Sequence, residues 1–159
     1  MLGIDPGSIK TGYGLLDSEG NRLRHIAHGL IKPKETDFMK RLHGLFKGLS
    51  EVIATYNPDV VAIEDVFMAK NASSALKLGQ ARGALIAACY HAGLEAHTYS
   101  PTAVKLSVVG FGRAEKQQVQ HMIQRILAPK EKMTEDAADA LAVAVCHAHN
   151  IPLLRRQVS

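Results

Sequence analysis

The hydrophobic periodicity of the chain changes at Pro33, and this change constrains the fold more than any other feature. Before Pro33, extended segments alternate with turn-forming pairs, a pattern that is typical of a β-meander. After it, apolar residues recur at helical spacing as far as Ile53, and the predicted helix ends before Asn57-Pro58, where proline discourages a further turn. The β-branched run Val60–Ile63 then suits a strand that is buried on both faces. A meander, a crossover helix and a parallel strand together indicate an α/β fold.

The remaining elements follow from the same reasoning. We expect strands over Leu2–Asp5, Thr11–Asp17, Arg22–Ile31, Val60–Ile63 and Ala96–Tyr99. We expect helices from Phe38 to just before Asn57, from about Ser74 to His91, after Ser100-Pro101, over about Ala114–Leu127, and over about Thr134–His149. A chain of 159 residues without a linker or repeat fits one domain, residues 1–159. The predicted architecture is a five-stranded mixed sheet flanked by helices.

The composition excludes two classes of protein. Apolar residues make up 47% of the chain and charged residues 21%, which are globular proportions and argue against disorder. No apolar run approaches the ~18–20 residues that a membrane span requires. The start of the chain shows no secretory signal, and two cysteines suggest no disulfide framework. We therefore expect a cytoplasmic, reduced protein.

The positive charge is unevenly distributed along the chain. Residues 66–94 hold three basic residues and no acidic one, and residues 101–132 hold six basic residues against two acidic ones. These stretches together carry +7 within a chain of net charge +4, so the remainder carries −3. A basic surface that flanks an acidic site would suit a phosphate-binding protein with a metal site. Ordinary solvated charge explains the same distribution equally well.

Four acidic residues lie at positions that could bring them together. Asp5 ends the first predicted strand and Glu64 ends the fourth, while Asp136 and Asp139 lie three positions apart near the start of the last helix. Residues three apart on a helix are neighbours on one face. If the first and fourth strands are adjacent and the last helix packs over them, the four carboxylates converge.

Each of these acids also has a structural explanation. Asp5 precedes a Pro-Gly turn, Glu64 could be the first solvated residue after a buried strand, and Asp136 would meet a helix dipole favourably. Asp139 is harder to explain, because it interrupts an otherwise apolar stretch. No Lys or Arg lies between Met133 and Pro152 to pair with it locally, and a buried carboxylate needs a partner.

Converging carboxylates require cations. Two carboxylates ~5 Å apart repel by roughly 3 kcal/mol at an effective dielectric of ~20. Oxygen ligands select hard divalent ions, so Mg²⁺ is favoured and Mn²⁺ is a substitute. Two such ions can activate a water molecule and stabilise the leaving oxygen of an in-line phosphoryl displacement. The four acids therefore predict metal-dependent phosphodiester hydrolysis with two ions per site.

Four stretches of the sequence closely resemble the bacterial RuvC Holliday-junction resolvases. They are Gly3–Gly14, Ala62–Leu85, Val104–Met122 and Asp136–Ala144, and they include the long motif FMAKNASSALKLGQARG. The resemblance implies a ribonuclease-H-like fold, a homodimer, and Mg²⁺-dependent paired nicks placed symmetrically in four-way DNA junctions in recombination and repair. It also implies that a branch-migration motor of the RuvAB kind is a partner. By matching motif, the metal-binding catalytic residues are Asp5, Glu64, Asp136 and Asp139.

The resemblance also implies residues that contact DNA. Lys105 lies in a proline-started helix and Lys116 in the first turn of the next helix, where backbone amides also attract phosphate. Arg113 and Lys70 are weaker candidates. Phe67 resembles the aromatic residue that the family inserts at the junction centre, where base stacking can supply ~1–3 kcal/mol. Its alternative role is to cap the hydrophobic core.

The predicted helix from about Ser74 to His91 is rich in small residues. Gly79 and Gly83 lie four apart on one face, and each costs ~1 kcal/mol relative to alanine. Close packing against the sheet would offset that cost, as would packing against a second copy of the chain. We expect a two-fold homodimer through the Ser74–Ala88 helix, which gives two active sites for two symmetric strands.

Three other functions remain open from the residues alone. Asp-x-Gly followed by a glycine-rich hairpin also occurs in actin-like nucleotide-binding modules, although such ATPases pair two domains around the nucleotide. A related single-domain RNA-processing nuclease of the YqgF type is the second alternative. The third is a junction-binding protein without cleavage activity, which the presence of all four acids disfavours.

Overall fold

A computed structural model describes residues 1–20, 22–65 and 71–157, and for residues 152–157 it describes the backbone only. A five-stranded sheet forms its centre, with the strands in the order β3-β2-β1-β4-β5. The strands are β1 (Leu2–Asp5), β2 (Thr11–Glu19), β3 (Arg22–Ile31), β4 (Val61–Glu64) and β5 (Ala96–Tyr99). β1 runs antiparallel to β2 and parallel to β4, so the sheet is mixed. The expected α/β fold with a five-stranded mixed sheet is confirmed.

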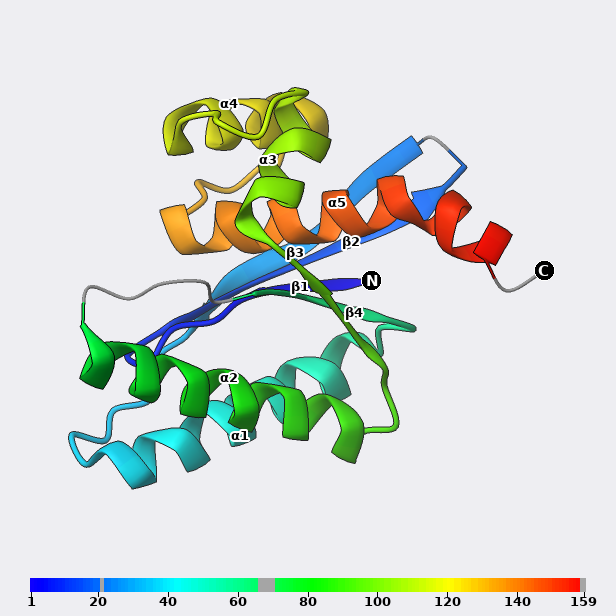
Figure 1. Cartoon of the computed structure of the whole chain (residues 1–159). Coiled ribbons are helices and arrows are strands. Elements are labelled where there is room, and N and C mark those ends of the chain that lie inside the picture. The colour runs from blue at the N-terminus through cyan, green and yellow to red at the C-terminus, as the bar shows by residue number, and fades with distance from the viewer. Residues whose placement is uncertain (21, 66–70, 158–159) are drawn as a thin grey trace.

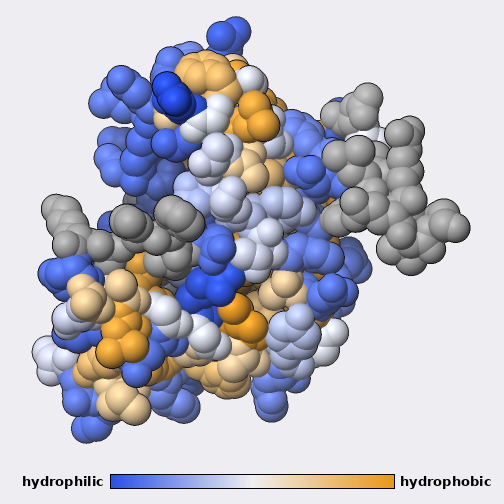
Figure 2. All heavy atoms as spheres, in the orientation of Figure 1, coloured by the Kyte–Doolittle hydropathy of each residue, from blue (hydrophilic) through white to orange (hydrophobic). Residues whose placement is uncertain are grey.

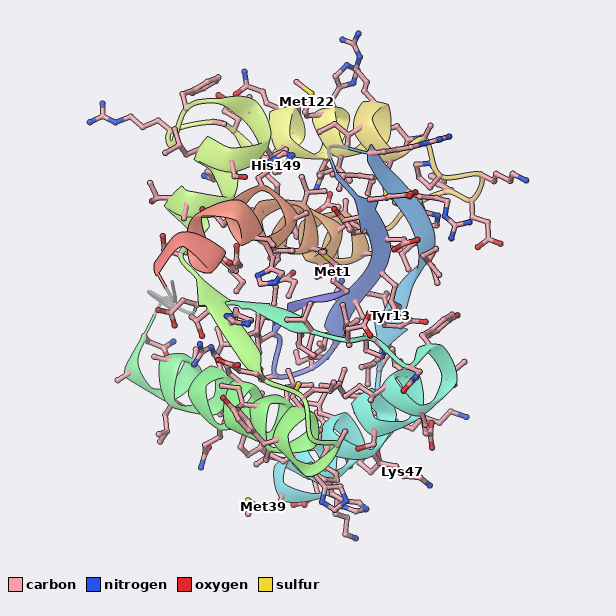
Figure 3. All side chains as sticks on the ribbon, turned by 90° about the vertical axis from the view of Figure 1, so that its right-hand side faces the viewer. Met1, Tyr13, Met39, Lys47, Met122 and His149 are labelled. Atoms are coloured by element: carbon pink, nitrogen blue, oxygen red, sulfur yellow. The ribbon has the colours of Figure 1, made fainter. Side chains whose placement is uncertain are left out.

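Helices cover both faces of this sheet (Figure 1). They are α1 (Phe38–Tyr56), α2 (Ala72–His91), α3 (Pro101–Val109), α4 (Lys116–Leu127) and α5 (Glu135–Gln157). α1 and α2 pack on one face, and α5 packs on the other with α3 and α4 outside it. Figure 3 shows the same layers from the side, with Met39 and Lys47 projecting outward from α1 and Met122 lying on α4.

Side-chain caps fix where the helices begin. The Asp37 carboxylate accepts a hydrogen bond from the Lys40 amide at 2.9 Å, and α1 begins at the next residue, Phe38. Asn71 caps α2 in the same way through the Ser74 amide, so α2 begins at Ala72, earlier than expected. A reciprocal capping box between Glu115 and Gln118 starts α4 at Lys116 instead of Ala114.

Three other boundaries differ from the sequence prediction. β2 continues to Glu19 because its pairing with β3 extends to the Glu19–Arg22 pair. β4 begins one residue later than expected, at Val61. α5 continues past Pro152 to Gln157, although the prediction ended it near His149. A proline removes one backbone hydrogen bond and usually ends or kinks a helix, which is why the prediction stopped before it.

The pleat of the central strands decides which residues face α5. Leu2 and Ile4 of β1 belong to the core beneath α1 and α2, so the alternate residues Gly3 and Asp5 face the opposite side. In β4, Val61 and Ile63 belong to that same core, while Ala62 packs with α5. Glu64 therefore faces α5 as Asp5 does. Because β1 and β4 are hydrogen-bonded neighbours, the two acids lie side by side at one sheet edge.

Glycines on the same face allow α5 to lie directly against the sheet. A Cβ atom at Gly12 would overlap the carbonyl oxygen of Asp136, and one at Gly3 would overlap that of Ala140. A side chain at either position would therefore push α5 away. The contact at Gly12 places the first turn of α5 beside the end of β1, since Gly12 pairs with Asp5.

One face of the molecule exposes hydrophobic side chains on α2 and on the α3–α4 region. Figure 2 shows them over α2 and over the α3–α4 region of an otherwise largely hydrophilic face. Leu76 and Tyr90 are the large exposed hydrophobic residues of α2, and Leu106 and Phe111 are those of the α3–α4 region. Among the described residues, no helix is both long and apolar enough to span a bilayer.

Candidate active site

The first turns of α5 carry two of the four acids. The Thr134 hydroxyl accepts a hydrogen bond from the Ala137 amide at 3.3 Å, and the Thr134 carbonyl accepts one from the Ala138 amide, which starts the helix. The stretch from Ala137 to His147 is buried apart from Asp139, whose side chain is 21% exposed. The side chain of Asp136 is 23% exposed. Both carboxylates therefore sit at the rim of a packed helix.

The two strand acids, Asp5 and Glu64, have pKa values well above those of ordinary carboxyl groups. Burial, followed by the nearby carboxylates of Glu64, Asp139 and Asp136, raises the pKa of Asp5 from 3.8 to about 8. Burial and then Asp139 raise the pKa of Glu64 from 4.5 to about 7, against the opposing charges of Lys116 and Lys105. These mutual effects require short distances between the charges. The structure therefore brings all four predicted acids into one neighbourhood.

Basic residues of α3 and α4 complete this neighbourhood. Nζ of Lys116 lies 2.8 Å from Oδ2 of Asp139 and 3.5 Å from Oε2 of Glu135. Lys105, Lys116, Glu64 and Asp139 line one hollow of about 180 Å³. Asp139 was expected to need a partner from outside its own helix, and Lys116 is that partner.

Two residues beside the acids, Lys10 and Gly12, were not predicted from the sequence. Lys10, which directly precedes β2, forms an ion pair with Asp136. Gly12 makes room for the Asp136 backbone. The sequence signal for Gly12 was present in Thr-Gly-Tyr-Gly, because glycines two apart in a strand lie on one face and often mark a close backbone approach. Lys10 gave no comparable signal.

The donor set fits a hard divalent cation. All four side chains offer carboxylate oxygens, and two of these carboxylates already contact positively charged ammonium groups, those of Lys10 and Lys116. Within the described residues, no three His, Cys, Asp or Glu side chains are drawn together as a formed metal-ligand set. The chemistry of the site thus suits Mg²⁺ or Mn²⁺, and a bound ion would have to draw the oxygens inward.

The other predicted DNA-contacting residues have different outcomes. Arg113 is exposed in the loop between α3 and α4. Phe67 and Lys70 lie outside the described residues. Asp65, which was not expected to join the acids, points toward α2, where Oδ1 lies 3.5 Å from Nη2 of Arg82.

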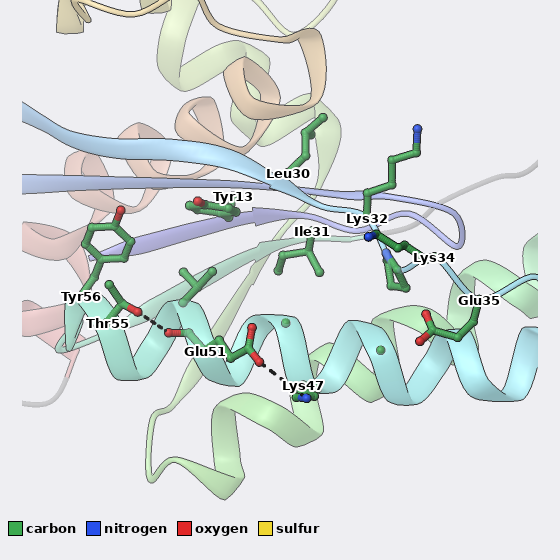
Figure 4. Close-up of a pocket in the computed structure, with 14 residues that line it drawn as sticks. Tyr13, Leu30, Ile31, Lys32, Lys34, Glu35, Lys47, Glu51, Thr55 and Tyr56 are labelled. Atoms are coloured by element: carbon green, nitrogen blue, oxygen red, sulfur yellow. Dashed lines mark hydrogen bonds and ion pairs between the residues drawn. The ribbon is translucent and has the colours of Figure 1, made fainter.

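A second hollow lies away from the acids, between the end of β3 and α1 (Figure 4). It has a volume of about 550 Å³ and contains none of the four carboxylates. Tyr13 and Tyr56 line it on one side and Lys32 and Lys34 on another, while Lys47 is paired with Glu51. Its size alone does not make it the reaction site, because the perturbed acids are elsewhere.

Comparison with known families decides between the remaining functions. Residues 1–147 match the family described as "Crossover junction endodeoxyribonuclease RuvC". The chain belongs to the RuvC family. It is accordingly a crossover junction endodeoxyribonuclease, and the nucleotide-binding and RNA-processing alternatives are set aside.

Individual relatives agree with this assignment. The RuvC of Citrifermentans bemidjiense is 60% identical over 151 residues, which are 94% of this chain and 92% of that protein. The solved structure of Thermus thermophilus RuvC in complex with Holliday junction substrate is 32% identical, with a TM-score of 0.88 over 96% of this chain and 94% of that one. A yeast mitochondrial Holliday junction resolvase shares the fold at 18% identity, with a TM-score of 0.70 over 98% and 80% of the two chains.

Proposed function

We propose that residues 1–159 form one nuclease domain that resolves four-way DNA junctions by metal-dependent hydrolysis at Asp5, Glu64, Asp136 and Asp139. The observation that carries this proposal is that the four acids lie close together on the α5 face of the sheet, where burial and their mutual repulsion raise the pKa values of Asp5 and Glu64. Perturbed carboxyl groups that lie beside lysines at the rim of a hollow are typical of a reaction site. A purely structural role would not require four acids to share one place.

The acids would hold two Mg²⁺ ions, for which Mn²⁺ can substitute. Such ions activate a water molecule and stabilise the leaving oxygen of the phosphodiester. The carboxylates would bind and orient the ions, and the burial of Asp5 and Glu64 leaves their oxygens poorly solvated. Lys116 and Lys105 reach the same hollow, where their ammonium groups would bind the phosphates of the cleaved strand.

The DNA-binding surface extends from this hollow. The solved Thermus thermophilus relative is a complex with Holliday junction substrate, which supports four-way junction DNA as the substrate of this chain. Lys105, Lys116 and Arg113 lie on the α3–α4 side of the site and would contact the backbone. Phe67 and Lys70 stay predicted contacts from the resemblance alone.

A homodimer through α2 would supply the second active site. The buried side of α2 is formed by Ala81, Leu85, Ala88 and Cys89, so its glycines do not pack on the sheet. A Cβ atom at Gly79 or Gly83 would have no neighbour within 4 Å among the described residues. These glycines lie in an exposed stripe with Leu76, Gln80, Ala87 and Tyr90. A second copy that packs on this stripe explains the cost of the glycines, because small residues permit close helix contact.

We infer a cytoplasmic setting from the family. The curated relatives at 52–60% identity come from bacteria, and junctions that arise in bacterial recombination lie in the cytoplasm. A RuvAB-type branch-migration complex is the partner that the resemblance implies.

The direct test is a gel assay of the purified protein on a synthetic four-way junction and on linear duplex of the same sequence, with and without Mg²⁺. We expect symmetric nicks in the junction with Mg²⁺, no cleavage with EDTA, and little cleavage of the duplex. Equal cleavage of both substrates would contradict the resolvase function. Cleavage that persists in EDTA would contradict the metal site.

A further inference from the structure

Lys10 contacts a carboxylate that the proposed function makes a metal ligand. Its ammonium group forms an ion pair with Oδ2 of Asp136, although the two residues are far apart in the sequence. The turn around Lys10 is tightly held. Oγ1 of buried Thr11 lies 3.3 Å from both the amide nitrogen and the carbonyl oxygen of Gly7. These contacts bridge the turn in which Lys10 lies, and the side chain of Lys10 is 46% exposed.

The lysine counter-ions of the site pair with the two acids of α5. Each of the two α5 acids contacts one lysine, Lys10 at Asp136 and Lys116 at Asp139. Within the described part of the chain, the two strand acids make no ion pair. Lys116 lines the hollow with Lys105, whereas Lys10 approaches from the β1–β2 turn and lies outside that hollow. Lys10 is thus placed to pair with Asp136 and not to contact a DNA strand bound in the hollow.

An ammonium group and a divalent cation compete for the same carboxylate. The oxygen that Lys10 occupies is a donor that the metal requires, and a positive charge at this position repels an incoming cation. An ion pair this exposed is weak, so it yields to a stronger ligand. We propose that Lys10 is a displaceable counter-ion of the metal site, which holds Asp136 in the metal-free enzyme and sets the metal concentration at which the site fills.

This inference rests on the proposed role of Asp136 as a metal ligand, and it assigns Lys10 as a positioning residue. The test is Mn²⁺ binding to the full chain without DNA, measured by electron paramagnetic resonance of the free ion. Lys10→Met should bind Mn²⁺ about fivefold more tightly than the wild type, the effect of losing one exposed ion pair. Lys10→Arg, which keeps the charge, should resemble the wild type.

Two further variants separate the ion pair from a general change in charge. Lys34→Met removes a positive charge from an exposed lysine that makes no ion pair among the described residues, and it should leave Mn²⁺ affinity unchanged. In an Asp136→Asn background, Lys10→Met should no longer tighten binding, because the two residues act as one unit. Thermal unfolding of each variant without metal checks that the fold is intact.

The outcomes distinguish this inference from the proposed function. If the wild type binds no Mn²⁺, the metal site and the role of Lys10 both fail. If the wild type binds Mn²⁺ but Lys10→Met binds it equally or more weakly, only the role of Lys10 fails. An equal gain in Lys34→Met would also overturn it, because the effect would then be general electrostatics.

Discussion

Lys116 at the start of α4 places its ammonium group 2.8 Å from the carboxylate of Asp139 in α5. The contact ties the outermost helix of this layer to the helix that lies on the sheet. It also sets a basic group directly beside an acid of the site, in the hollow that Lys105 shares. Cation-binding and phosphate-binding groups therefore meet at one place, and the following predictions test each part of this arrangement.

Neutralising either α5 acid should stop the reaction without stopping substrate binding. Asp136→Asn and Asp139→Asn each remove a charged oxygen ligand, and we expect cleavage to fall by at least about 10³-fold, as for residues that act as a unit. Binding to a four-way junction in Ca²⁺ or EDTA, measured by gel shift, should stay nearly unchanged. Asp17→Asn, at an exposed ion pair with Arg24, is the control. Variants at Asp136 or Asp139 that nick at the normal rate would refute the ligand assignment.

Removing Lys105 should weaken contact with the DNA backbone. Lys105→Ala should slow cleavage, and it should lower the salt dependence of junction binding by about one unit in the slope of log K against log salt. Lys47→Ala is the matched control, because Lys47 lies on α1 at the opposite sheet face and pairs with Glu51. An unchanged slope for Lys105→Ala would mean that this residue does not touch phosphate.

A methyl group at Gly12 should disturb both stability and activity. Its Cβ would overlap the Asp136 carbonyl, so α5 must shift away from β2. We expect Gly12→Ala to lower the free energy of unfolding by about 1–3 kcal/mol and to reduce cleavage because Asp136 moves from Asp5. Denaturant unfolding and the junction assay measure the two effects. A stable, fully active variant would contradict the close packing of α5 on β2.

The stability of the metal-free protein should fall as pH rises. The folded state raises the pKa of Asp5 to about 8 and that of Glu64 to about 7, from ordinary values of 3.8 and 4.5. The folded chain therefore keeps protons that the unfolded chain has lost. This contribution is fully present below about pH 4, declines as the pH rises, and is lost once the pH has passed the folded pKa values of about 7 and about 8.

The measurement is the thermal midpoint in EDTA between pH 6 and pH 9, where we expect a fall up to about pH 8 and a plateau from these two groups above it. Mg²⁺ should remove this fall. Asp5→Asn should flatten the profile. Burial lowers the pKa of the Met1 amino group, which acts in the opposite direction, and the comparison with Asp5→Asn cancels that contribution. Identical slopes for the wild type and Asp5→Asn would show that folding does not raise the pKa of Asp5.

A charge on the exposed stripe of α2 should separate the dimer. A side chain at Gly83 meets no described neighbour within the chain, so Gly83→Lys should leave the monomer folded. We expect monomers in sedimentation and single nicks instead of linearisation of a circular plasmid that carries a cruciform. Met39→Lys, at an exposed position of α1, should leave dimers intact. A wild type that sediments as a monomer with and without junction DNA would exclude the paired-nick geometry.

The sequence predicted the order of the elements from local patterns, and it predicted that the four acids converge from the expected placement of two strands and a helix. Pleat alternation and parallel pairing were enough to bring Asp5 and Glu64 to one sheet edge. The isolation of Asp139 in an apolar helix correctly indicated a distant partner. The boundaries that were wrong involve competition between local signals. The predicted helix starts at about Ser74, but Asn71 caps α2 and the helix begins at Ala72.

The sequence did not predict the Lys10–Asp136 pair, for a physical reason. A lysine before a strand is ordinary, and only the close approach of α5 to β2 brings Asp136 within its reach. That approach depends on Gly12, whose importance appears once a helix is known to cross that strand. Tertiary contacts of this kind have no periodic signature along the chain.

The two faces of the sheet have different roles. On one side, α5 supplies buried alanines to the core and two acids to the reaction from the same few turns, so repacking there alters turnover as well as folding. On the other side, Leu45, Leu49, Ile53 and Leu85 of α1 and α2 fill a separate core, on the face of the sheet opposite to α5. Substitutions that raise thermal stability should therefore be made first in the core beneath α1, where tighter packing leaves the active site unchanged.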